Sequence, residues 1–225
     1  MSMAGLARVY TDIQGVRIAL GNKTWATENA GNVAIPQIYV DMIDQLKDME
    51  KGLIREASQQ LKTHPAWDTW GKHVKGFGPT LAMQLFGQIG DIGRFDTVSK
   101  LWKYCGLGVT DGKADRRRKG EKLSYSPRLK TLLYNIGTSF LKTKSPYRDI
   151  YDEKKLVYET RKDESGKEWS KLRIHLASMR IMEKIFLAHM WQKWREAEGL
   201  LIREEYVFDY LGHTTRYKPE DFMKP

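Results

Sequence analysis

The chain has 225 residues and a formal net charge of +10, which is enough for one large domain with a buried core. This basic balance predicts a polyanionic partner, with nucleic acid as the first expectation and an anionic membrane surface as the second. A run of about 18 apolar residues and a signal-peptide segment are both missing, which excludes a membrane span. The single cysteine, Cys105, excludes an intrachain disulfide and fits a reducing cytosol, where its apolar context predicts a buried thiol.

Two apolar helical repeats open the chain. A helix is expected over residues 5–20, ending at Gly21, with a loop over 22–35 and a second helix from Pro36 to about Leu61. The two seams consist of Leu6, Val9, Ile13, Val16 and Leu20, and of Tyr39, Met42, Leu46, Met49 and Leu53. Such seams should pair with each other, or between two chains as a short coiled coil. Residues 1–65 are therefore expected to form a helical arm, with a homodimer through residues 5–61 as one alternative and packing on the main domain as the other.

The rest of the chain also has helical periodicity. Helices are expected over 66–74, from Pro79 onward, and over 97–105, 127–142, 147–160 and 170–198, with a glycine-rich loop at 108–122. Strand-like alternation is nearly missing; residues 9–20 are the only weak candidate. The sequence thus predicts an all-α fold, with a nucleic-acid-binding domain over 66–211 and a polar, loosely packed tail over 212–225.

A glycine elbow, Lys75-Gly76-Phe77-Gly78-Pro79-Thr80, precedes one of these helices. Glycine allows positive φ and close approach of another chain, and proline fits the first helical position. The free amides and dipole of that helix start favour a phosphate, while Phe77 is expected to plug the space between the flanking helices. The candidate contacts are Lys75, Gly76, Gly78 and Thr80. A purely structural turn is the alternative. A second glycine pair, Gly106 and Gly108, could form a second such hairpin.

A basic segment follows the second glycine pair. Between Asp111 and Lys130 eight basic residues face three acidic ones. Arginine forks match phosphate geometry, so these eight are candidate nucleic-acid contacts: Lys113, Arg116, Arg117, Arg118, Lys119, Lys122, Arg128 and Lys130. A solvated loop is the alternative. Ser124 or Ser126 is expected to cap the helix that starts at Pro127.

Taken in order, these segments resemble the C-terminal transposase domain of the insertion-sequence one-ten recombinase family. The resemblance rests on Lys75–Pro79, Ile89–Phe95, Tyr104–Leu107, Arg116–Ser124 and Arg128–Leu133, and extends over roughly residues 36–198. It implies a helix-hairpin-helix that grips the nucleic-acid backbone. It also suggests a phage-like, nuclease-less relative in the cytosol of a bacterial host.

Two departures from the family pattern bear on chemistry. The family carries an N-terminal RuvC-like nuclease domain, and the thirty-five residues before the region of resemblance are too few for that fold. The family also places a catalytic serine just before the basic loop, where this chain offers only Thr110 as a weak candidate. The resemblance therefore implies sequence-independent binding of duplex or branched DNA, as an accessory to recombination or replication. The alternatives are a reduced recombinase or nuclease and a module that binds structured RNA.

Metal and cofactor motifs are not found. The five histidines show no metal-ligand spacing, and the glycine-rich phosphate-binding motif of nucleotide hydrolases is missing. No cofactor and no metal are expected.

Overall fold

The computed structural model describes residues 1–31, 34–110, 113–115, 120, 122–202 and 217–223. Within these residues the fold is helical, which confirms the all-α prediction. The α-helices are α1 (Met3–Gly31), α2 (Gln37–Leu61), α3 (Pro65–Thr69), α4 (Pro79–Ile89), α5 (Val98–Tyr104), α6 (Pro127–Thr143), α7 (Tyr147–Glu159) and α8 (Lys171–Ala197). The described strands are two residues each, β1 (Val109–Thr110) and β2 (Lys113–Ala114), and they pair antiparallel.

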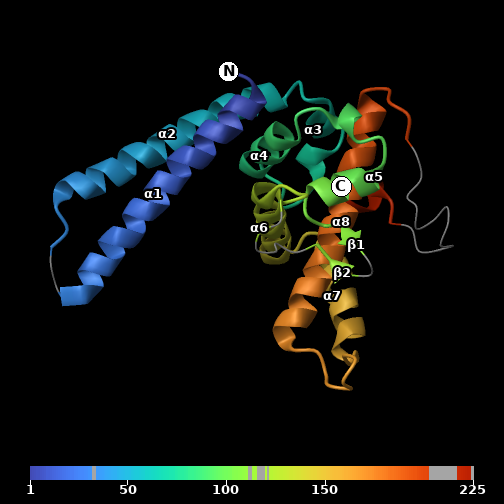
Figure 1. Cartoon of the computed structure of the whole chain (residues 1–225). Coiled ribbons are helices and arrows are strands. Elements are labelled where there is room, and N and C mark those ends of the chain that lie inside the picture. The colour runs from blue at the N-terminus through green and yellow to red at the C-terminus, as the bar shows by residue number, and fades with distance from the viewer. Residues whose placement is uncertain (32–33, 111–112, 116–119, 121, 203–216, 224–225) are drawn as a thin grey trace.

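Helices α1 and α2 lie side by side as a long hairpin that projects from the rest of the molecule (Figure 1). The predicted helix end at Gly21 is wrong, because α1 continues to Gly31. Residues 22–31 are mostly good or tolerated helix formers, so they extend the helix although they lack an apolar stripe. The weak strand candidate at residues 9–20 is also helical.

Burial within this hairpin is concentrated at its base rather than along the predicted seams. Leu6 and Tyr10 of α1 pack with Ala57 of α2 and Met83 of α4. Farther out, Met42 and Met49 of the second seam are 43% and 56% exposed. The seams are filled only where α4 adds a third helix, since two helices alone cannot enclose a full apolar stripe.

One close approach joins the hairpin to the main body, and an ion pair joins its two helices. A Cβ added to Gly87 of α4 would lie 2.7 Å from the carbonyl oxygen of Met3, so α1 and α4 approach at backbone distance. Between α1 and α2, Arg17 Nε donates to Glu50 Oε1 at 2.6 Å, and Glu50 is buried.

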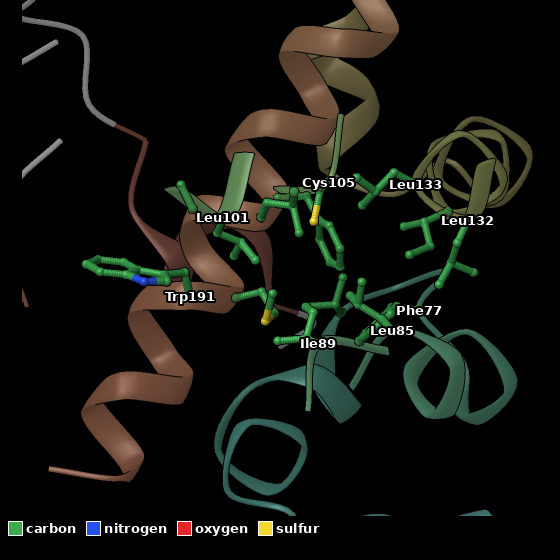
Figure 2. Packing of buried hydrophobic residues seen from close by; sticks show 14 of the residues in the cluster. Phe77, Leu85, Ile89, Leu101, Cys105, Leu132, Leu133 and Trp191 are labelled. Carbon is green, nitrogen blue, oxygen red and sulfur yellow. The ribbon is translucent and has the colours of Figure 1, made fainter. Parts of the chain in front are cut away.

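The main core surrounds α8, which contacts α3, α5, α6 and α7. Figure 2 shows Leu85 and Ile89 of α4 and Leu132 and Leu133 of α6 meeting in this core. Trp191 of α8 belongs to the same cluster. Cys105 is also part of it, and burial raises the pKa of its thiol to about 12. The prediction of a buried thiol is confirmed, and such a thiol is unreactive because its thiolate is disfavoured.

The end of the chain is partly packed, which corrects the expectation of a loose tail. Phe222 is buried and stacks on Tyr147 with ring centroids 4.5 Å apart. The backbone of Met223 forms an isolated bridge with Val74, just before the glycine elbow. The tail therefore joins the core through Phe222, an aromatic residue in a polar segment, and through the backbone of Met223.

Candidate nucleic-acid interface

The glycine elbow lies between a short 3-10 turn, Gly71–His73, and the start of α4. Gly76 has φ +88°, and a Cβ added there would lie 2.5 Å from Thr143 Oγ1 at the end of α6. Its carbonyl oxygen accepts a hydrogen bond from Ser139 Oγ at 2.7 Å. Glycine is therefore required at residue 76, both by the backbone conformation and by the contact with α6.

Phe77 anchors the elbow in the core, as predicted. Its ring is buried and meets Phe86 of α4 and Phe186 of α8 edge to face, with centroids 5.9 and 5.1 Å apart. The ring of Trp67 in α3 is also close, with its centroid 6.0 Å from that of Phe77. This aromatic cluster holds α3, α4 and α8 around the turn, so the backbone of the elbow has a fixed position.

The opposite face of the elbow is open. Gly78 is exposed, and a Cβ added to it would meet nothing within 4 Å. Pro79 begins α4 and no side chain caps the helix, so the amides of Thr80 and Leu81 have no intrahelical acceptor. A surface pocket opens here, lined by the elbow, by Trp67 and Lys72, and by Ser139 of α6. Uncapped amides beside a pocket form a place where an oxyanion can bind.

Two lysines flank this open face. Lys75 is exposed and forms no ion pair with any part of the chain that the structure describes. Lys72 lines the pocket and pairs with Asp68, Nζ to Oδ1 at 2.6 Å, on the same short stretch of chain. Lys75 is thus an exposed cation next to the pocket in the sequence, and Lys72 is the lysine that lines it.

The basic segment is described only in part. Arg116, Arg117, Arg118 and Lys119 lie outside the described residues, as do the side chains of Lys113 and Thr110. Lys122 and Arg128 are exposed. Lys130 is engaged within the protein, because its ammonium lies over the Tyr125 ring at 4.7 Å and donates to the Asp115 carbonyl oxygen at 3.2 Å.

The second glycine pair does not form a second hairpin of the same kind. Gly106 has φ +79° and ends α5, but the chain then enters β1 rather than a helix. Arg180 of α8 donates to the Gly108 carbonyl oxygen at 2.6 Å, and Leu107 is buried. The pair therefore fixes to α8 the residues that lead into the basic segment, and we call this fixed part the base of that segment. The pair presents no helix start to a ligand.

A buried carboxyl group lies near this base. Glu183 lies one turn after Arg180 on α8 and is 7% exposed. Burial raises the pKa of Glu183 to about 8, and the nearby cations Arg180 and Lys130 partly oppose that rise. Burial also lowers the pKa of Arg180 from its ordinary value, against the attraction of Glu183 and Asp115.

Helix α6 connects the two candidate sites. The elbow contacts its C-terminal end through Ser139, and the base of the basic segment contacts its N-terminal end through Lys130. Ser126 caps that N-terminal end as predicted, accepting from the Leu129 amide at 3.3 Å. With a rise of about 1.5 Å per residue, the two ends of this connection are about 14 Å apart along the helix axis. The sites are thus separate but lie on one rigid element.

Across the ranges given above, no group of three or more histidine, cysteine, aspartate or glutamate side chains is placed to hold a metal ion. In the same ranges, no helix is long and apolar enough to span a membrane.

Sequence reasoning missed the exposed side chains of α6 between the two sites. Thr131, Asn135 and Lys142 were seen only as parts of a helix with a buried stripe. Two features of the sequence indicate these side chains. One is the lack of any acidic residue between Glu121 and Asp149, and the other is the helical period of the apolar residues in this segment.

Comparison with known families gives one match. Residues 72–152 match the model described as the Transposase IS116/IS110/IS902 family, which confirms the family resemblance over the elbow, the basic segment, α6 and the start of α7. Transposases recombine DNA, so the match associates this part of the chain with DNA recombination. Searches of curated proteins and of solved structures gave no significant match.

Proposed function

From this transposase-family segment, we propose that the chain binds DNA through its sugar–phosphate backbone, without sequence preference, as an accessory to recombination or replication. The observation that carries the proposal is the uncapped start of α4, where Thr80 and Leu81 line a pocket beside exposed Gly78. Amide donors and a lysine recognise a phosphate group but do not read a base. Such contacts suit a duplex or a branched junction of any sequence.

The basic segment supplies the second set of proposed DNA contacts. Lys122 and Arg128 are exposed at its C-terminal part, and the three consecutive arginines, Arg116, Arg117 and Arg118, add charge in the same segment. Each phosphate neutralised releases counterions, so the affinity should fall steeply with salt.

A binding panel tests the proposal. The protein is titrated against single-stranded, duplex and four-way DNA and structured RNA at two salt concentrations, with magnesium added in parallel. We expect similar affinities for unrelated duplexes and a steep salt dependence. A clear preference for RNA would overturn the choice of DNA, and cleavage or a covalent adduct would overturn the accessory role in favour of catalysis.

Point variants test which residues contact the DNA. Lys75→Ala should weaken binding to every duplex and reduce the salt slope by about one unit, and the triple change of Arg116, Arg117 and Arg118 to alanine should reduce it by about three. Lys23→Ala is the matched control, because Lys23 is an exposed lysine on α1 that carries the same charge far from the elbow. Equal effects of Lys75→Ala and Lys23→Ala would remove the elbow from the site.

A further inference from the structure

A long acid-free segment occupies the centre of the family match. From Lys122 through Arg148, with both ends counted, there are six basic residues and no acidic residue. A solvated surface normally mixes both signs of charge, and α2 does so with residues such as Asp41 and Lys47. The segment contains the whole of α6, whose buried face packs on α4, α7 and α8. The outer face of α6 therefore has a one-sided charge that packing does not require.

The outer face of α6 carries a row of side chains that can donate hydrogen bonds. Arg128, Thr131, Asn135 and Lys142 are all exposed and, at about 100° per residue, lie within a sector of about 60°. Across the described chain, the side chains of Arg128, Asn135 and Lys142 form no hydrogen bond or ion pair with another residue. We call these four residues the α6 stripe.

The stripe has one candidate site at each end. At its C-terminal end, Ser139 holds the Gly76 carbonyl oxygen of the elbow. At its N-terminal end, Arg128 continues the basic segment, and Ser126 ties this end to α5 by donating its amide to the Tyr104 carbonyl oxygen at 2.8 Å. Both sites contact α6, so a ligand that binds at both sites has this helix between its two contacts.

The side chains of the α6 stripe favour a nucleic acid over a protein as its ligand. A protein partner would need apolar anchors at the centre of the surface, and the stripe offers hydroxyl, amide and cationic groups instead. From Arg128 to Lys142 the stripe is about 21 Å long. A duplex carries one phosphate per strand for about every 3.4 Å of its axis, so about six base pairs would fit along the stripe.

We propose that the outer face of α6 is a track for the backbone of duplex DNA, joining the elbow to the basic segment into one binding surface. The track rests on the proposed function, and it adds a defined path and a footprint for the duplex. Asn135 lies at the middle of that path, between the two basic ends.

Charge changes at Asn135 test the track without disturbing the core, because Asn135 is exposed. Asn135→Lys should bind duplex DNA more tightly and steepen the salt slope by about 0.9, which corresponds to about 8-fold in affinity at 0.1 M salt. Asn135→Asp, with nearly the same shape, should weaken binding by a similar factor. Fluorescence anisotropy with a 20-base-pair duplex measures both effects.

Matched controls come from α2. Gln45 is exposed on the projecting hairpin, so Gln45→Lys and Gln45→Asp change the net charge by the same amounts away from the track. If the Asn135 and Gln45 variants shift the affinity equally, the track is wrong and only net charge matters. Misfolding of the Asn135→Lys variant would lower its affinity for DNA. The increased affinity that we expect for this variant therefore cannot arise from misfolding.

The design separates the track from the proposed function. If wild-type protein binds no duplex, the proposed function fails and the track fails with it. If wild-type protein binds duplex DNA but both Asn135 variants bind as wild type does, the track alone is refuted. Displacement of the duplex by poly-glutamate at equal charge concentration would refute DNA as the occupant, in favour of an acidic protein.

Discussion

Glu183 provides a quantitative test of how the base of the basic segment is built. Its carboxyl is packed against α6, where a Cβ added to Gly137 would lie 3.5 Å from Glu183 Oε1. Burial raises its pKa from an ordinary value of 4.5 to about 8. The folded protein therefore holds this proton more tightly than the unfolded chain does. The resulting stabilisation is complete below pH 4.5 and is lost as the pH rises to 8.

The size of the effect follows from the pKa difference. Each unit of pKa corresponds to about 1.4 kcal/mol, so the full loss is about 5 kcal/mol. About 2 kcal/mol of this is already lost at pH 6, which leaves a further fall of about 3 kcal/mol between pH 6 and pH 9. Glu183→Gln keeps the shape and removes the charge, so that variant should not show this fall.

Urea unfolding of wild type and Glu183→Gln at pH 6 and pH 9 measures the difference. We expect the free energy of unfolding of wild type, relative to the variant, to drop by about 3 kcal/mol over this range. Other titrating groups, including the histidines, are common to both proteins and cancel in the comparison. If the two proteins change by the same amount, Glu183 is not protonated in the folded state at pH 6 and the reasoning is refuted.

Three further predictions concern the elbow and its surroundings. Gly76→Ala should lower the free energy of unfolding by more than about 1 kcal/mol, because of its positive φ and the contact with Thr143, whereas Gly78→Ala should leave thermal stability nearly unchanged; equal melting temperatures would contradict this. Phe77→Ala should cost about 3 to 5 kcal/mol by opening a cavity in the aromatic cluster, measured by urea unfolding; a cost below about 1 kcal/mol would show that the ring is not packed. Burial lowers the pKa of His64 to about 4, so stability should fall by up to about 3 kcal/mol as the pH drops from 6.5 to 4; His64→Gln should reduce this fall, and an unchanged pH profile would refute it.

Local patterns predicted the elements of the main domain closely. The expected helix at 127–142 is observed at Pro127–Thr143, and the one at 170–198 is observed at Lys171–Ala197. These succeeded because their caps and apolar periods are local properties of the chain. The elbow was predicted for the same reason, since two glycines and a proline restrict the backbone regardless of what surrounds it.

The sequence-based predictions were wrong where the burial of a side chain depends on segments that are distant in the sequence. The α1–α2 seams looked uniform in the sequence, yet only the end that meets Met83 of α4 is buried. Likewise, Phe222 became a core residue because Tyr147 lies opposite it. No local period can report such contacts, which are set by the way helices assemble.

The sequence alone determined an all-α chain of strongly basic character, with a glycine elbow and a cationic segment that match a transposase family. Only the tertiary structure decided which face of the elbow is open, that Lys130 and Arg180 serve the base of the basic segment, and that α6 links the two sites. The physical reason is that backbone conformation and local charge are set by residues that are neighbours in the sequence. The exposure of a side chain depends instead on residues that folding brings together from the whole chain.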